Sequence, residues 1–186
     1  MAWMNEKENR ELGEKYPWLI PKDESDYDYS WTYLDEMPRG WRKAFGELIC
    51  ADIQRELEAA NLVDEYGISE IKEKFGELRW YDYGGNEKID DIVTAYTVIS
   101  RNVCVQCGKL DVHIFDNGWI QPLCKECANK YFKNLVYEDW IVEGDDGVIC
   151  EKHRFSRYDY AIGKWTDHAV DISDYVRKVR EYNKCT

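Results

Sequence analysis

Apolar residues recur at helical and then at strand-like intervals along the first hundred residues. Between Trp41 and Leu62 they return every three or four positions, which predicts a helix with one buried face. Residues 68–81 change to an alternating pattern that reverses at Phe75-Gly76, as two antiparallel strands would. Asn86 follows and is placed to cap a second helix. The expected apolar face of that helix consists of Ile89, Ile92, Val93, Tyr96 and Ile99.

The second half of the chain continues this mixture of short helices and strands. Asp116-Asn117-Gly118 between two apolar runs is typical of a hairpin turn, and a helix is expected over residues 125–136. Beyond it we expect a hairpin over 140–150, a strand over 158–162 and a last helix from Asp171. The pattern predicts an α+β fold with helices packed on a small antiparallel sheet.

Four cysteines supply the clearest chemical signal. Cys104 and Cys107 form one CxxC pair, and Cys124 and Cys127 form a second pair sixteen residues later. Two such pairs at this distance predict a tetrathiolate zinc site, because each CxxC turn supplies two corners of a tetrahedron. A pair of disulfides is the alternative. We therefore divide the chain into an acidic α+β region (1–103), a zinc-ribbon-like module (104–136) and a C-terminal α+β segment (137–186) packed on the same unit.

Zinc bound by four protein ligands has no open position for water or substrate, so we expect a structural Zn²⁺ rather than a catalytic one. The sequence contains no Gly-x-Ser-x-Gly, no His-Glu-x-x-His and no phosphate-binding glycine loop. No catalytic residue is therefore predicted, and the expected protein is not an enzyme. Cys150 and His153 resemble half of a second metal site, which only His168 and Cys185 could complete. A structural thiol and a surface histidine explain them more simply.

The chain is acidic, and its charge is uneven. It has 37 acidic and 25 basic residues, giving a formal net charge of −12. Residues 1–100 hold 23 of the acids and 12 of the bases, whereas residues 101–186 hold 14 and 13. Direct nucleic-acid binding needs a basic face, so it is disfavoured. An acidic surface instead suits a protein partner with a basic surface, although acidity for solubility alone is the alternative.

Candidate partner-binding residues lie in the acidic, tyrosine-rich segment that follows Pro21: Asp23, Glu24, Asp26 and Asp28. A loop whose aromatic side chains pack on the core while its acids face water is the plainer interpretation. The sequence has no apolar stretch long enough to span a membrane, and its first residues lack the apolar region of a signal peptide. Thiols available for a metal fit a reducing compartment. We therefore expect a cytoplasmic protein, in the host cytoplasm if it is encoded by a phage.

Several motifs resemble those of an uncharacterised zinc-binding CxxC…CxxC protein family of Firmicutes and their phages. The resemblance covers residues 16–127. It lies in the stretches 34–46 and 71–81, in the two CxxC pairs, and in Gly118-Trp119-Ile120 between them. The whole chain also resembles zinc-containing anti-CRISPR proteins that inhibit type II-A Cas9. That resemblance implies a non-enzymatic inhibitor that blocks a DNA-handling surface of Cas9, whose nucleic-acid channel is positively charged. A zinc-stabilised phage or bacterial protein that binds another host protein is the alternative, and an enzyme comes third.

Overall fold

The computed structural model describes residues 6–22, 27–131, 152–159 and 162–185, together with residues 142, 147 and 149. Five α-helices longer than one turn lie in this part of the chain: α1 (Glu6–Lys15), α3 (Glu47–Ala60), α4 (Glu87–Ser100), α5 (Lys125–Tyr131) and α6 (Ser173–Cys185). Shorter helical turns are η1 (Pro17–Leu19), η2 (Tyr33–Glu36), α2 (Arg39–Trp41) and the π-helical turn η3 (Arg42–Gly46). The predicted mixture of helices with small antiparallel sheets is confirmed.

The strands form three separate antiparallel hairpins. They are β1 (Gly67–Lys74) with β2 (Glu77–Tyr83), β3 (His113–Asp116) with β4 (Ile120–Leu123), and β5 (Lys152–Asp159) with β6 (Lys164–Asp171). In the first hairpin Lys74 faces Glu77, so Phe75 and Gly76 make the two-residue turn that the sequence predicts. The second hairpin turns at Asn117-Gly118-Trp119, also near the expected place.

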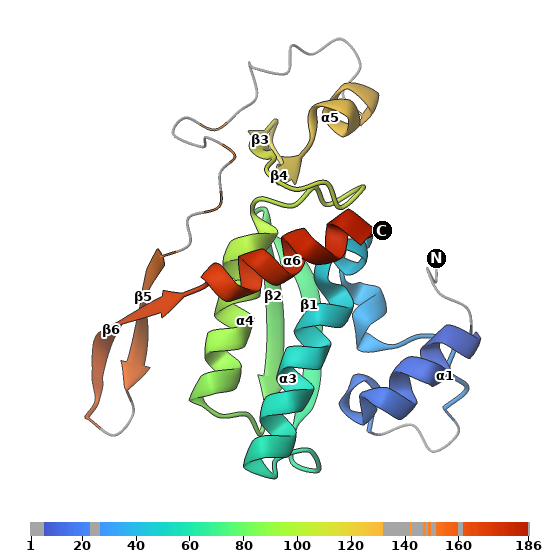
Figure 1. Cartoon of the computed structure of the whole chain (residues 1–186), viewed down its shortest axis with the longest axis vertical. Helices are drawn as coiled ribbons and strands as arrows, with labels where there is room; N and C mark the ends of the chain where they lie inside the picture. The colour runs from blue at the N-terminus through green and yellow to red at the C-terminus, as the bar shows by residue number, and fades with distance from the viewer. Residues whose placement is uncertain are drawn as a thin grey trace.

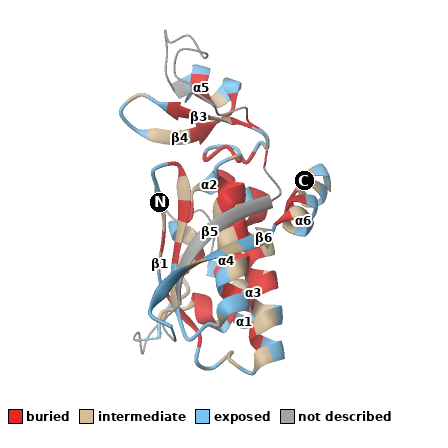
Figure 2. Cartoon of the chain, turned by 90° about the vertical axis from the view of Figure 1, so that its left-hand side faces the viewer, coloured by how far each residue is buried: buried red, intermediate tan, exposed pale blue. Residues whose placement is uncertain are grey.

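The core lies where α3 and α4 pack side by side against the β1–β2 hairpin (Figure 1). The predicted apolar faces are buried there, including Ile49, Ile53, Ile92 and Ile99. The Asn86 side chain accepts a hydrogen bond from the Ile89 N–H at 3.0 Å and caps α4 as expected. Figure 2 shows that buried residues concentrate on the inner faces of these elements, while β6 is largely exposed.

Several tyrosine and tryptophan side chains in the core form hydrogen bonds with other side chains. The Trp18 indole N–H donates to Gln54 Oε1 at 2.7 Å, and the Trp80 indole N–H donates to the Tyr66 hydroxyl at 3.1 Å. Buried aromatic residues of this kind need such partners, because an unpaired buried donor costs about 1–3 kcal/mol. These bonds help to fix one arrangement of the helices on the hairpin.

Helix α6 crosses the upper ends of α3 and α4 and brings the C-terminal segment back to the core (Figure 1). Val176 and Val179 on the inner face of α6 are buried. The Lys178 ammonium donates at 2.7 Å to Asp52 on α3, a carboxylate that also accepts from the Tyr96 hydroxyl at 2.9 Å. Because Asp52 is almost wholly buried, these donors are what make its position on an apolar helix face tolerable.

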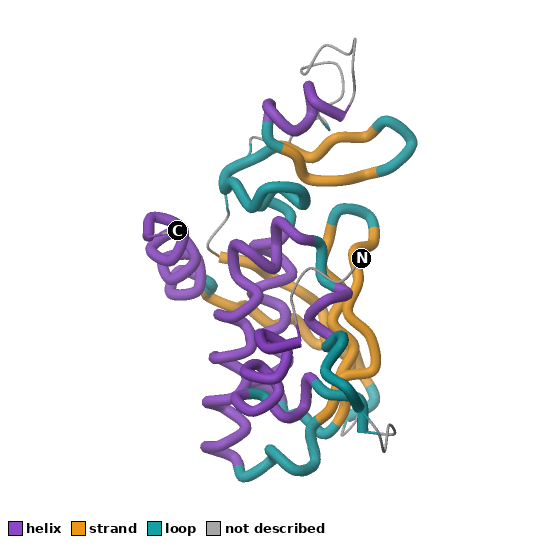
Figure 3. Tube along the Cα trace, turned by 90° about the vertical axis from the view of Figure 1, so that its right-hand side faces the viewer, coloured by secondary structure: helices purple, strands orange, loops and turns teal. Residues whose placement is uncertain are grey.

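Some expected elements differ from the structure or fall outside it. The strand expected at 158–162 is wrong at its end: β5 runs over Lys152–Asp159, and Ile162 lies in a turn before β6. The hairpin expected over 140–150 and the end of the helix expected over 125–136 lie outside the described residues. In Figure 3 the helices gather on one side and the β1–β2 hairpin on the other, with the β3–β4 hairpin beyond its tip.

Candidate metal centre

The first CxxC pair lies on a tight turn that directly follows α4. The Gly108 N–H donates to the Cys104 carbonyl at 3.0 Å, and the Cys104 N–H donates to the Lys109 carbonyl at 2.8 Å. Gly108 has a φ of +82°, in the left-handed region that glycine adopts at little cost. This turn, Val103–Leu110, is called the first knuckle below. Its shape presents the Cys104 and Cys107 side chains on the same side.

The second CxxC pair opens helix α5. The Ala128 N–H donates to the Cys124 carbonyl at 2.9 Å, and the Cys127 N–H donates to the Cys124 sulfur at 3.4 Å. The β3–β4 hairpin between the pairs reverses the chain and returns it to the first knuckle (Figure 1). The predicted convergence of the two pairs is therefore confirmed.

All four sulfurs lie within 4.8 Å of one another, and Cys107 Sγ is 3.7 Å from Cys124 Sγ. A tetrahedral site with metal–sulfur bonds of about 2.3 Å separates its ligands by about 3.8 Å. A disulfide would need about 2.05 Å, and the four cysteines are free thiols in the structure, so its geometry fits a metal site rather than two disulfides. The cluster can hold a metal ion with the protein supplying a full tetrahedral set of ligands.

Packing four sulfurs together changes how readily they lose their protons. Burial raises the pKa of Cys124 to about 12, and burial together with the neighbouring Cys104 raises the pKa of Cys127. At Cys107 burial acts in the same direction, but hydrogen bonds from the Lys109 backbone and the other cysteines outweigh it and lower the pKa. A bound divalent cation would compensate the thiolates and displace the protons, which is the usual chemistry of such ligand sets.

The first knuckle is fixed to the helical core through its backbone. The Gly40 N–H donates to the Val105 carbonyl at 2.8 Å, and the buried Trp41 indole N–H donates to the Val103 carbonyl at 2.7 Å. A β-carbon on Gly40 would lie 2.0 Å from the Cys104 carbonyl oxygen, so only glycine permits this approach. The Val105 N–H donates to the Pro122 carbonyl at 3.1 Å and joins the knuckle to β4.

An exposed ion pair also joins the first knuckle to helix α5. The Lys109 ammonium lies 3.0 Å from Glu126 Oε1, and both side chains are more than half exposed. Surface pairs of this kind are typically worth about 0–1 kcal/mol, so the cysteines and the backbone contacts dominate the local stability.

Among the described residues, Cys50, His113 and His168 lie outside this cluster. Cys50 is fully buried in α3, and burial raises the pKa of its thiol, as suits a small core residue. His113 on β3 is half-buried and lies outside the group of four ligands. His168 Nε2 lies 3.2 Å from Thr166 Oγ1 on β6. Cys150 and the side chains of His153 and Cys185 are outside the described residues, so a second metal site there stays a hypothesis.

Of the four candidate partner-binding residues, the structure describes Asp28 alone. Asp23, Glu24 and Asp26 lie outside the described residues. Asp28 is exposed and accepts a 2.8 Å hydrogen bond from the Ser30 N–H. Hydrogen bonds from the Ser30 side chain and backbone lower the pKa of Asp28. The carboxylate is therefore charged at neutral pH, as a contact to a basic partner would require.

Sequence reasoning missed a groove that forms between two hairpin turns. A cleft of about 340 Å³ separates the β1–β2 turn from the β3–β4 turn, and Phe75 and Trp119 line it from opposite sides. A second cleft of about 450 Å³ shares Glu73 and Trp119 with the first and extends past Glu36 and Arg39. Together these two clefts are called the hairpin groove. The one signal in the sequence is an aromatic residue at a turn position where asparagine or aspartate is usual.

No helix in the described parts of the chain is both long and apolar enough to cross a membrane. Comparison of the chain with protein-family models, with curated proteins and with solved structures found no match. Function must therefore be argued from the cysteine cluster and the surfaces around it.

Proposed function

We propose that this chain is a non-enzymatic, zinc-stabilised binding protein whose partner is a protein with a basic surface. Cas9 is the leading candidate for that partner, because the chain resembles anti-CRISPR proteins that inhibit it, and a cytoplasmic location belongs to the same proposal. The observation that carries the proposal is the hairpin groove, in which two exposed aromatic side chains lie among carboxylates.

Zinc is the metal that best suits the cluster. Four cysteine thiolates at tetrahedral spacing are a common structural zinc site, and they leave no position for a substrate. The metal module also supplies one wall of the groove, since Trp119 stands on the hairpin that joins the two cysteine pairs. Zinc would therefore act by holding a binding surface in place.

Phe75 is costly for the protein to keep. Its φ is +56°, in the left-handed region that bulky residues rarely adopt, and its side chain is 62% exposed. The side chain gains little stability from burial, and its backbone strains the turn. Contact with a partner would explain why a phenylalanine occupies this position. Trp119, at 65% exposed, presents a second aromatic surface across the groove.

The groove favours cationic side chains. Its lining contains the three carboxylates Glu36, Glu73 and Asp116 against the two cations Arg39 and Lys74. A fourth lining carboxylate, Asp35, is already paired with Arg42. Glu73 and Asp116 each accept a backbone hydrogen bond in their own turn, which fixes them beside the aromatic rings. The Lys74 ammonium already lies 5.3 Å from the centre of the Phe75 ring. An arginine or lysine of a partner would gain from the same cation–π and charge attraction.

The proposal is tested by measuring the affinity of the zinc-loaded protein for purified Cas9, with and without guide RNA. Trp119→Ala should weaken binding by about 2 kcal/mol, the loss typical of a central aromatic contact. Trp165→Ala is the matched control, since Trp165 is 70% exposed on β6 and does not line the groove. Equal losses from the two variants would contradict the role of the groove.

Salt and charge reversal examine the acidic surface separately. Binding should weaken as salt rises, because exposed charges are screened beyond ~8 Å at physiological ionic strength. Reversing Asp23, Asp26 and Asp28 to lysine should weaken it further. If neither change alters the affinity, the acidic surface serves solubility alone. A protein with one zinc per chain that does not bind Cas9 at all would leave the alternative, another host protein, as the partner.

A further inference from the structure

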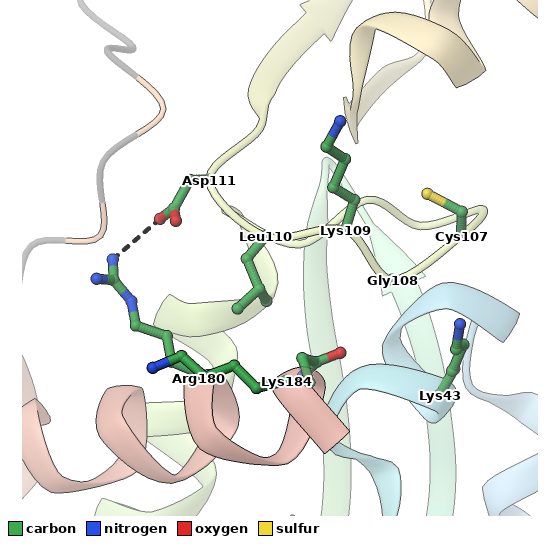
Figure 4. Close-up of a pocket in the computed structure, with 9 residues that line it drawn as sticks. Lys43, Cys107, Gly108, Lys109, Leu110, Asp111, Arg180 and Lys184 are labelled. Atoms are coloured by element: carbon green, nitrogen blue, oxygen red, sulfur yellow. Dashed lines mark hydrogen bonds and ion pairs between the residues drawn. The ribbon is translucent and has the colours of Figure 1, made fainter. Parts of the chain in front are cut away.

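A basic cleft lies between the first knuckle and two elements that pack on the core, in a chain that is strongly acidic overall. It encloses about 620 Å³ between the knuckle, the turn η3 and helix α6. Lys43 comes from η3, Cys107 and Lys109 from the knuckle, and Arg180 and Lys184 from α6, as Figure 4 shows. Asp111 is the one acidic residue in its lining among the described residues.

Not all of these cations are available to a ligand. Lys109 is paired with Glu126, and the Arg180 Nη2 donates to Asp111 Oδ1 at 3.0 Å. Lys43 and Lys184 are exposed, and neither forms an ion pair within the described residues. Two lysines therefore keep their full charge at the mouth of the cleft.

Arg180 is held in position but is not fully used by the protein. The hydrogen bond to Asp111 orients the guanidinium of Arg180. Figure 4 draws this bond as a dashed line. Its buried Nε has no hydrogen-bond partner among the described groups. A planar guanidinium fixed in this way is well suited to a tetrahedral oxyanion, because its donors match the spacing of two oxygens.

The net charge of −12 does not cancel this local field. Exposed charges more than ~8 Å away are largely screened at physiological ionic strength, so a ligand in the cleft senses mainly the charges that line it. These include the exposed Lys43 and Lys184, the Arg180–Asp111 pair, and the cysteine cluster, which reaches the cleft at Cys107. The basic residues come from three segments that are distant in sequence, and only the folded chain brings them together. This explains why the sequence pattern alone gave no sign of them.

We propose that this cleft binds phosphate groups, with Lys43, Arg180 and Lys184 as their ligands. The phosphate would belong either to a free polyphosphate or nucleotide, or to a nucleic-acid backbone. This site is separate from the hairpin groove, and it stands whether or not Cas9 is the partner.

The experiment titrates the zinc-loaded full chain with two probes, inorganic pyrophosphate and a short single-stranded oligonucleotide of mixed sequence. The double variant Lys43→Glu/Lys184→Glu should bind the effective probe at least about tenfold more weakly, because two attractive charges become repulsive. Lys7→Glu/Lys88→Glu is the control, since it changes the net charge equally at exposed positions on α1 and α4. The control should alter affinity by no more than about twofold, as expected for screened charges.

The two probes distinguish the sources of phosphate. If the protein binds pyrophosphate but not the oligonucleotide, the ligand is a free phosphate compound. If it binds the oligonucleotide but not pyrophosphate, with a steep salt dependence, the ligand is a nucleic-acid backbone. Failure of both probes overturns the proposal, as does an equal loss in the two double variants. Tighter binding of a polyglutamate peptide than of either probe overturns it in favour of an acidic protein.

Zinc content, measured in every variant, excludes a different role for the lysines. Four thiolates and one divalent cation carry two net negative charges, and Cys107 lines the cleft. If Lys43→Glu/Lys184→Glu loses zinc while the parent protein binds no phosphate, the lysines serve to balance the thiolates and the proposal is wrong. Unchanged zinc content together with lost phosphate binding supports it.

Discussion

The β1–β2 hairpin and the β3–β4 hairpin are similar in form but are held in place by different means. The first is covered by α3 and α4 and buries Ile71, Leu78 and Trp80 in the main core. The second has only four residues in each strand and lies at the end of the molecule, between the two cysteine pairs. A small segment that cannot bury enough apolar surface needs another source of stability, and a metal is the common one. A structural zinc would therefore matter most for the second hairpin, where the main core ends.

Loss of a cysteine ligand should have the largest effect, because it would remove the metal that stabilises the second hairpin. Cys124→Ser should abolish binding of one zinc per chain, since structural zinc contributes on the order of 10 kcal/mol in small modules. Cys50→Ala is the matched control, because Cys50 is a buried cysteine that lies outside the cluster. Elemental analysis of both purified variants measures the result. Full zinc content in Cys124→Ser would show that the cluster is not the site.

Gly40→Ala should have the next largest effect, because it breaks the connection between the two regions rather than either region alone. The added carbon would lie 2.0 Å from the Cys104 carbonyl oxygen, which is backbone and cannot move aside without disturbing the ligands. We expect a loss of roughly 3 kcal/mol or more in unfolding free energy, measured by denaturant titration.

Gly46→Ala is the control for this variant. Its added carbon would lie 3.2 Å from Arg42 Cγ, a close side-chain contact that needs a shift of only a few tenths of an ångström, rather than a collision with backbone. We expect a change within about 1 kcal/mol, the range of ordinary glycine-to-alanine exchanges in helices. Equal destabilisation by the two alanines would mean that the contact between Gly40 and the knuckle has no special importance.

Phe75→Asn should slightly raise the stability of the protein and lower its affinity for the partner. Asparagine tolerates a positive φ, so the first hairpin should become more stable by up to about 1 kcal/mol. Affinity for the partner should fall, because one aromatic wall of the hairpin groove is gone. Thermal unfolding and the Cas9 titration measure the two quantities. A variant that loses both stability and affinity would contradict the view that Phe75 is kept for binding.

Local sequence patterns predict some elements of the fold closely and others only approximately. The reversal at Phe75-Gly76, the Asn86 cap and the spacing of the cysteines depend on neighbouring residues, and the structure confirms all three. The end of β5 could not be placed in this way, because the alternation at residues 158–162 continues past the point where the chain turns. Local patterns therefore predict the ends of such short elements only approximately.

The surfaces around the metal centre could not be predicted from the sequence. Phe75 and Trp119 are separated by more than forty residues, and the groove exists only because the first knuckle attaches the second hairpin beside the first. The same holds for Lys43 and Arg180 in the basic cleft. Gly40 gives no sign in the sequence that its backbone contacts the first knuckle. Each of these features depends on tertiary contacts between segments whose own patterns are ordinary.

Hydrogen exchange of the native protein before and after removal of its metal tests the central claim most directly. We predict that amides in β3, β4 and α5 lose protection when the metal is removed. Those in α3, α4 and β1–β2 should keep theirs, because their apolar contacts do not involve the cysteines. Exchange that is unchanged throughout, or that rises equally in both regions, would contradict the account in which a metal holds the second hairpin against an independently stable core.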